Sequence, residues 1–139
     1  MIRNKPIQQD ILKAIPRAEI YLKNREDILF AYLFGSYAEG SVGPLSDLDV
    51  AIYLSGENVS EKKMEILGHL IDIFKTDEID LVVLNNAPLT LRMKILQKKR
   101  LLADNAPFIR HAYESVTMRS YFDFSKIEKG ILERRFLNG

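Results

Sequence analysis

The spacing of apolar residues changes from helical to strand-like at about residue 28. A helix over residues 6–24 is predicted by four apolar residues at helical spacing, Ile7, Ile11, Leu12 and Ile15. Pro16 should kink this helix or start a second one, because proline cannot donate the backbone hydrogen bond. Residues 28–34 are apolar throughout, which predicts a strand buried on both faces.

A second strand is predicted over residues 48–54, where every other residue is apolar. Successive side chains of a strand point to opposite faces. One face therefore carries an apolar set directed at the core, Leu48, Val50, Ile52 and Leu54. Between the two strands, residues 36–40 predict a short helical turn and residues 41–46 a loop containing Gly43-Pro44.

The remainder continues to alternate between helix and strand. Asn58 begins a predicted helix whose core stripe is expected to be Met64, Leu67, Ile71 and Phe74. Further elements are predicted at residues 79–84 (strand), 88–98 (helix), 100–103 (short edge strand) and 107–136 (mainly helix). This order predicts an α/β (α+β) fold, a small mixed β-sheet with helices packed against it. No repeat or linker is present, so we expect one domain over residues 1–139 with a C-terminal helical segment at about 105–137.

Composition narrows the class of protein. With 139 residues, 47% hydrophobic and 28% charged, the chain suits one globular domain. Its net charge of +1 gives no general attraction to nucleic acid or anionic membranes, so we expect neither direct nucleic-acid binding nor membrane association. The absence of cysteine excludes disulfides and thiolate zinc sites. We find no signal peptide in residues 1–10 and no apolar run of about 20 residues, and we expect a cytoplasmic location.

Three aspartates interrupt the apolar strands. Asp47 and Asp49 fall on one face of the second strand, about 6–7 Å apart at their Cα atoms. Asp80 lies in the third strand, which should be largely buried, so its carboxylate needs a partner. Converging carboxylates repel one another unless a cation lies between them, and hard oxygen ligands favour Mg²⁺ or Mn²⁺. We therefore expect a metal site formed by these three aspartates, the alternative for Asp47 and Asp49 being a solvated strand end.

Gly35 and Ser36 lie directly after the first strand. A glycine there lets the backbone turn sharply and approach a ligand, and the helical turn that follows offers free N–H groups to an anion. A Gly-Ser pair alone is usually only a turn. Ten residues separate Ser36 from Asp47, so a phosphate-sized turn here faces a paired-carboxylate site.

Gly35-Ser36, ten residues, Asp47-x-Asp49 and a later strand Asp80 resemble the signature of the DNA polymerase β-type nucleotidyltransferase superfamily. The compact chain resembles its minimal nucleotidyltransferase (MNT) branch, and the whole length, with Tyr121-Phe122-Asp123-Phe124, resembles the MntA-type antitoxins of HEPN/MNT toxin–antitoxin pairs. The resemblance implies the polymerase β-type fold and two Mg²⁺ ions held by Asp47 and Asp49.

The resemblance also assigns the other site residues. Asp80 would bind the catalytic metal and help to deprotonate the attacking hydroxyl, and Gly35 and Ser36 would hold the β- and γ-phosphates of ATP. Many minimal members carry an arginine four residues after the motif glycine, where this chain has Glu39. A cation expected near the phosphates is then missing or is supplied by another residue.

The implied activity is AMP transfer from ATP to a tyrosine of a cognate HEPN ribonuclease toxin, which would make the chain the antitoxin of a type VII pair. One alternative is a small-molecule nucleotidyltransferase of the antibiotic-resistance type, although 139 residues leave little room for an acceptor site. Another is a stoichiometric antitoxin that only masks its toxin. The intact Gly-Ser pair and the three acids argue against pure masking.

Two further groups of residues are open to more than one interpretation. The densest basic run comprises Arg92, Lys94, Lys98, Lys99 and Arg100, and it is either a solvated helix face or a phosphate contact. Tyr121, Phe122 and Phe124 cannot all face one core from a single helix. Either the helix breaks there, or part of the cluster is exposed as a binding surface, or the aromatics close the open side of the sheet.

Overall fold

A four-stranded mixed sheet forms the centre of the computed structural model, which describes residues 8–43 and 46–137. The strands are β1 (Ile28–Phe34), β2 (Leu48–Leu54), β3 (Ile79–Val83) and β4 (Arg100–Asp104). Their order is β3-β2-β1-β4, with β1 antiparallel to both β2 and β4, and β2 parallel to β3. The mixed sheet flanked by helices that the sequence predicts is confirmed.

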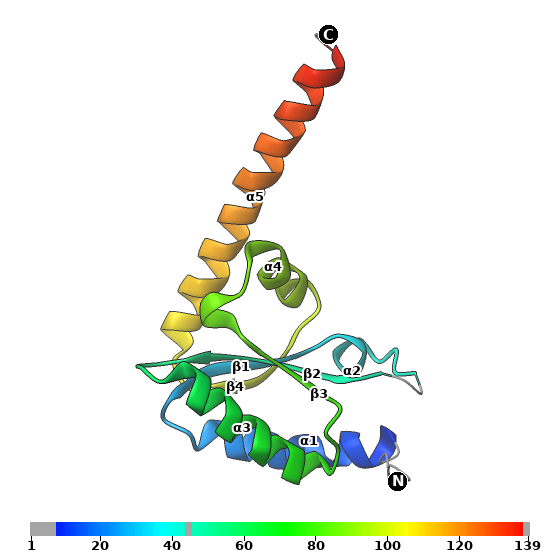
Figure 1. Ribbon diagram of the computed structural model, residues 1–139, viewed down its shortest axis with the longest axis vertical. Coiled ribbons are helices and arrows are strands. Elements are labelled where there is room, and N and C mark those ends of the chain that lie inside the picture. The colour runs from blue at the N-terminus through cyan, green and yellow to red at the C-terminus, as the bar shows by residue number, and fades with distance from the viewer. Residues whose placement is uncertain (1–7, 44–45, 138–139) are drawn as a thin grey trace.

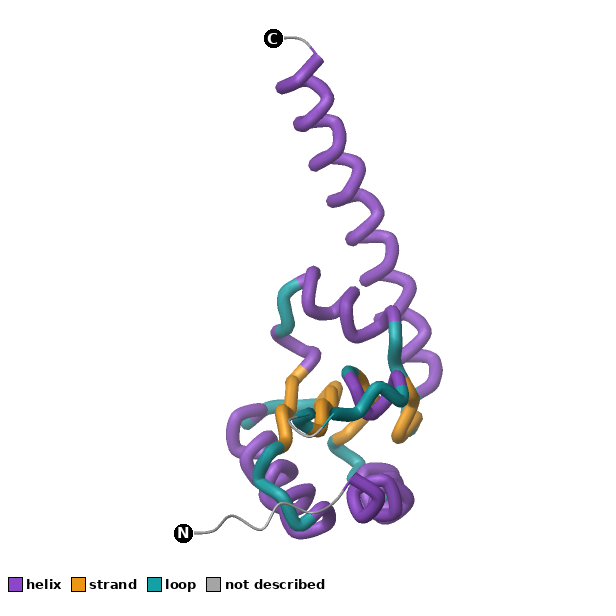
Figure 2. Tube along the Cα trace, turned by 90° about the vertical axis from the view of Figure 1, so that its right-hand side faces the viewer, coloured by secondary structure: helices purple, strands orange, loops and turns teal. Residues whose placement is uncertain are grey.

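Helices cover both faces of the sheet (Figure 1). They are α1 (Gln8–Lys23), α2 (Ser36–Glu39), α3 (Val59–Phe74), α4 (Leu89–Gln97) and α5 (Pro107–Leu137), with a 3₁₀ turn η1 at Leu84–Asn86. The first and third lie under one face, and α4 and the start of α5 lie on the other. A view turned by 90° shows α5 running well past the rest of the chain (Figure 2). No helix in the described parts of the chain combines the length and apolarity needed to cross a bilayer.

Strand alternation divides the core into two layers. The four apolar residues of β2 predicted to face the core pack with α1 and α3, in a cluster that also holds Ala31 and Leu33 of β1. The alternate residues of β1, Phe30, Tyr32 and Phe34, pack on the other face with Ile95 and Leu96 of α4. Because β1 is buried on both faces, it is the central strand, as its continuous apolar run predicts. Asp49 and Asp80 belong to the face covered by α4.

Some predicted details of the helices are wrong. Pro16 does not start a second helix but lies inside α1 on its exposed side, where water can satisfy the carbonyl left without a donor. In α3 Phe74 is buried and Leu67 packs against the core, as predicted, but Met64 is 64% exposed, and Ile66 and Leu70 are buried in addition. Two overlapping apolar stripes run along α3, and the sheet and α1 cover the one shifted from our prediction. Residues 6–7 and 44–45, parts of the predicted helix and loop, lie outside the described residues.

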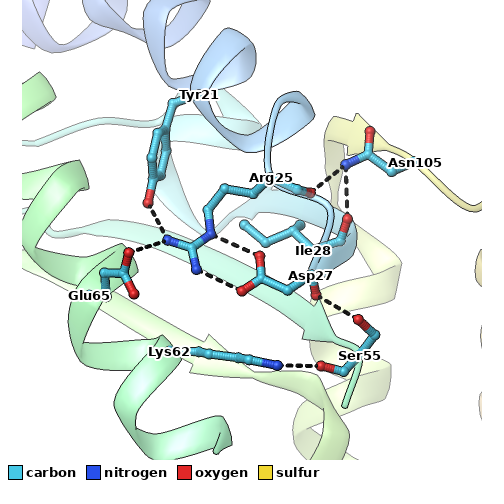
Figure 3. Close-up of polar contacts among 8 residues, drawn as sticks. All are labelled: Tyr21, Arg25, Asp27, Ile28, Ser55, Lys62, Glu65 and Asn105. Atoms are coloured by element: carbon cyan, nitrogen blue, oxygen red, sulfur yellow. Dashed lines mark hydrogen bonds and ion pairs between the residues drawn. The ribbon is translucent and has the colours of Figure 1, made fainter. Parts of the chain in front are cut away.

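A polar network closes one end of the sheet (Figure 3). Arg25 forms a bidentate ion pair with Asp27 at 2.6 and 2.8 Å and also contacts Tyr21 and Glu65. The side-chain amide of Asn105 donates to three carbonyls at the end of α1 and the start of β1, those of Leu22, Arg25 and Ile28. These bonds hold the loop between α1 and β1 in place. They connect it to α1, to α3 and to the residue that follows β4. The opposite end, where β1 finishes and β2 begins, carries the acids.

The aromatic cluster near the C-terminus lies on an unbroken helix. Phe122 is 59% exposed and Phe124 is 47% exposed, while Tyr121 is half-buried. The interpretation that these aromatics close the open side of the sheet is therefore wrong, since α5 has already left the sheet at this point. The start of α5 is fixed instead by the Tyr32 hydroxyl, which donates to Glu114 at 2.9 Å, and by Arg110, which pairs with both Asp104 and Glu114.

Candidate functional site

The candidate site is a pocket of about 430 Å³ at the open end of the sheet, between the sheet and α4. Asp49 on β2 and Asp80 on β3 are direct partners in the parallel register, so both carboxylates project from the same face of neighbouring strands into this pocket. Phe34, Val82 and Leu91 supply its apolar wall. Two acids that the sequence separates by thirty-one positions are thus brought together by one strand pairing.

Asp49 carries the electrostatic signature of the site. Burial raises its pKa to about 6, and the nearby carboxylates of Asp80 and Asp47 act in the same direction, while Lys94 opposes them. A half-buried carboxylate with two acidic neighbours favours any cation that can share it. Asp49 is therefore close enough to both other acids to be affected by their charge, and the predicted metal site stays a prediction.

The three aspartates do not share one environment. Asp47 precedes β2, is exposed, and is not among the residues that line the pocket. Asp80 is also exposed, so our expectation that it sits in a largely buried strand is wrong. The reason is that β3 is an edge strand, open to solvent beside Asp80. Within residues 8–43 and 46–137, no three acidic or histidine side chains converge closely enough to bind a metal ion.

The donor set nevertheless fits a small divalent cation that is shared with a ligand. Mg²⁺ is usually held by one or two carboxylates together with substrate phosphates and water, and not by a complete cage of protein ligands. Asp49 and Asp80 supply two carboxylates facing one pocket, and burial, together with the neighbouring acids, raises the pKa of Asp49, so a cation beside its carboxylate would be favourable.

Gly35 brings the backbone of the turn against Asp49. Its φ of +71° and ψ of −153° belong to a region that essentially only glycine occupies, and a Cβ added there would overlap the Asp49 carboxylate. Ser36 follows as the first residue of α2, and Glu39 N–H donates back to the Gly35 carbonyl at 3.1 Å. Gly35 lines the pocket, whereas Ser36 lies beside it. The predicted tight turn is confirmed, and phosphate binding by Ser36 stays a prediction.

Gly35→Ala should lower the free energy of unfolding by about 2 kcal/mol or more, because strain in this backbone region adds to the overlap with Asp49. Gly40→Ala is the matched control, since Gly40 also has a positive φ of +77° but has nothing within 4 Å of an added Cβ. Its cost should be about 1 kcal/mol. Urea unfolding of both variants measures the difference. Equal losses would show that Gly35 and Asp49 do not constrain each other.

Lys94 in α4 and Lys98 directly after it complete the pocket, and our sequence interpretation named them only as part of the basic run. Leu91, Lys94 and Lys98 recur at i, i+3 and i+7, so one side of α4 faces the pocket. The Lys98 ammonium lies 2.8 Å from the carboxylate of Glu39, which also lines the pocket. Their spacing from the apolar residue Leu91 could have identified these two lysines in the sequence. The density of positive charge alone could not distinguish them from the neighbouring basic residues.

The rest of the basic run is engaged elsewhere. Arg92 and Lys99 lie over the rings of Tyr113 and Tyr32, at 5.9 and 5.7 Å from the ring centroids, and Arg100 contacts Glu19. The run therefore does not form one continuous phosphate-binding face. It divides into pocket lysines and structural cations.

Comparisons with known proteins cover the part of the chain that forms this pocket. The model of the family Polymerase beta, Nucleotidyltransferase matches residues 18–107, which include every residue lining the pocket. No curated protein matches the sequence significantly.

Several solved structures share the fold. A toxin–antitoxin crystal structure with AMP-PNP superposes with a TM-score of 0.65 and 20% identity, covering 92% of this chain and 97% of that chain. A complex of the tri-AMPylated Shewanella oneidensis HEPN toxin with MNT antitoxin gives 0.65 and 20%, over 87% and 95% of the two chains. A toxin–antitoxin MntA-HepT structure gives 0.63 and 20%, over 87% and 96%. At these identities the similarity establishes a common fold, which confirms the fold class predicted from the sequence.

Proposed function

Because this chain belongs to the polymerase beta nucleotidyltransferase family, we propose that it transfers AMP from ATP to a tyrosine hydroxyl of a cognate HEPN ribonuclease toxin, as the antitoxin of a type VII pair. The observation that carries this proposal is the pairing of Asp49 with Asp80 in one pocket, beside a glycine that no other residue could replace without overlap. Solved structures of the same fold support the choice of nucleotide and partner, since one contains AMP-PNP and another contains a tri-AMPylated HEPN toxin.

Asp49 and Asp80 would hold Mg²⁺ together with the phosphates of ATP, and the exposed Asp47, two residues before Asp49, would complete the ligand set. The bound metal would supply positive charge to the α-phosphate and to the departing pyrophosphate. Burial and the neighbouring acids both disfavour the negative charge of Asp49. A bound cation would therefore stabilise this carboxylate more than the exposed ones.

The reaction itself is an in-line displacement. The tyrosine oxygen forms a bond to the α-phosphorus, the bond to the β-phosphate oxygen breaks, and pyrophosphate leaves. The proton of the tyrosine passes to the carboxylate of Asp80. Its exposure at the sheet edge suits this assignment, because a base that serves a protein substrate has to be reachable from outside. Gly35 and Ser36 would position the β- and γ-phosphates.

The test is incorporation of α-labelled ATP into the purified toxin in the presence of Mg²⁺. We expect label on toxin tyrosine, release of pyrophosphate and loss of ribonuclease activity, all prevented by EDTA. Silencing of the toxin without label would identify a stoichiometric antitoxin. Label that appears only on a small hydroxylated acceptor would favour the antibiotic-type activity.

The projecting part of α5 is the surface we assign to the toxin. Phe124, Ile127 and Ile131 continue at helical spacing the face on which Tyr113 and Thr117 pack against the body, yet all three are about half exposed or more. An apolar stripe that continues a packed face beyond the core is a surface suited to docking another helix.

Truncation after Ser120 should preserve nucleotide binding while transfer to the toxin falls at least about tenfold, because the polar contacts described between α5 and β1, β4 and η1 come from residues before Ser120. Phe124→Glu in the full-length chain should likewise reduce transfer to the toxin and leave nucleotide binding unchanged. Met118→Glu is the matched control, an exposed apolar residue on the opposite side of α5. Full transfer by the truncated protein would remove this segment from the toxin-binding surface.

A further inference from the structure

One ion pair spans the mouth of the pocket. Glu39 is the last residue of α2 and Lys98 follows the last residue of α4, so their contact at 2.8 Å joins the turn after β1 to the helix on the opposite wall. Both residues line the pocket. Lys98 is 71% exposed, and exposed ion pairs are weak and screened by salt, so this contact opens readily.

The charged side chains that line the pocket carry an excess of negative charge. Three carboxylates line the pocket, from Glu39, Asp49 and Asp80, against the two ammonium groups of Lys94 and Lys98. Lys94 acts on Asp49, and Lys98 is held by Glu39. A ligand with several anionic oxygens can therefore gain Lys98 only in competition with Glu39.

Both lysines lie where one extended anion can reach them. Lys94 is in the last turn of α4, Lys98 is the residue that ends the helix, and both line the same pocket. A chain of phosphates lying along α4 could contact both, and each charge-assisted hydrogen bond from an ammonium to a phosphate oxygen is stronger than a neutral one. A single phosphate would reach fewer of these donors.

We propose that Lys94 and Lys98 bind the polyphosphate tail of the nucleotide, and that Glu39 restrains binding by occupying Lys98 until the tail displaces it. This inference rests on the proposed function, which supplies the nucleoside triphosphate. It assigns to α4 the cation that the turn after β1 lacks, and it makes Glu39 a residue that lowers nucleotide affinity.

The experiment is calorimetric titration of the full-length protein with a non-hydrolysable ATP analogue and Mg²⁺, and separately with AMP. Lys98→Gln should weaken binding of the ATP analogue about tenfold, and Glu39→Gln should tighten it several-fold, since Lys98 becomes free. In the double variant the gain from Glu39→Gln should shrink. AMP has no tail, so its affinity should barely change in any variant. Lys99→Gln is the control, because it removes the same charge from the next residue, which lies outside the pocket.

The outcomes separate this inference from the proposed function. A wild-type protein that binds no nucleotide would contradict the proposed function itself. Wild-type binding with unchanged affinities in Glu39→Gln and Lys98→Gln would overturn only the assignment of the tail to α4. Equal weakening of AMP and the ATP analogue by Lys98→Gln would also overturn it, because the lysine would then not be contacting the tail.

Discussion

Asp49→Asn is expected to reduce AMP transfer to background while leaving the fold intact. The amide preserves the shape of the side chain next to Gly35 but is a poor ligand for Mg²⁺, and Asp49 is the carboxylate most enclosed by the site. Transfer of label from ATP to the toxin is the measurement. Asp72→Asn, an exposed acid on α3, is the matched control and should transfer at the wild-type rate.

The same substitution should stabilise the metal-free protein in a pH-dependent way. The pKa of Asp49 is raised in the folded state to about 6, above the value of about 3.9 expected in the unfolded chain. The folded state therefore binds more protons between these values, and the wild-type protein loses stability as the pH rises through this window. Asp49→Asn escapes this loss, so near neutral pH it should be more stable by about 1–2 kcal/mol, allowing for partial solvation of the carboxylate.

Urea unfolding in EDTA at about pH 4 and about pH 8 tests this second effect, since the window of the shift lies between them. The difference between wild type and variant should be small at the lower pH and larger at the higher one. Parallel pH profiles would mean that Asp49 is not an uncompensated acid, and the case for a cation there would lose its electrostatic support. Wild-type transfer by the variant would contradict the metal site directly.

Asp80→Asn is expected to lower turnover by about a hundredfold or more, the scale of a general-base effect. ATP should still bind, because Asp49 and Asp47 keep their carboxylates and the pocket lysines are untouched. Transfer rates and the affinity for a non-hydrolysable ATP analogue, measured on the same preparation, separate the two contributions. Since Asp80 is exposed at the edge of the sheet, its substitution should change the free energy of unfolding little.

A parallel loss of ATP affinity and turnover would show that Asp80 acts through the bound metal and nucleotide alone, without the additional role in proton transfer. Unchanged turnover would mean that solvent or the toxin removes the tyrosine proton. Glu78, two residues earlier on the same segment, offers no substitute because it precedes β3 and does not line the pocket.

The strands of the sheet could be predicted well because each has a pattern of apolar residues, a continuous run or an alternation, that is visible within a few positions of the sequence. A run without polar residues could only be a central strand, and β1 is one. Strict alternation located the inward face of β2, and with it the face that carries Asp49. Gly35 could be recognised because a sharp turn after a buried strand needs its conformational freedom, which its φ of +71° uses.

Other features depend on which elements become neighbours, and local spacing does not contain that information. Asp80 looked buried because its strand is apolar, but the edge position of β3 leaves it open to water. In α3 apolar residues cover more than one stripe, and packing against the core decided that Ile66 and Leu70 are buried and Met64 is not. The pairing of Lys98 with Glu39 joins residues far apart in sequence, so charge density along α4 could not reveal it.

The amide of Asn105 has a consequence for the order in which the chain can assemble during synthesis. It bonds to carbonyls from Leu22 to Ile28, which emerge from the ribosome long before it does, and it directly follows β4, which pairs with the outer edge of β1. Until residues 100–105 are made, one edge of β1 has no neighbouring strand. The loop that leads into β1 also lacks the hydrogen bonds from Asn105. An open edge of this kind recruits other strands. We therefore expect nascent chains that stop before Asn105 to depend on chaperones, and the last residues of the sheet to determine when the molecule becomes safe from aggregation.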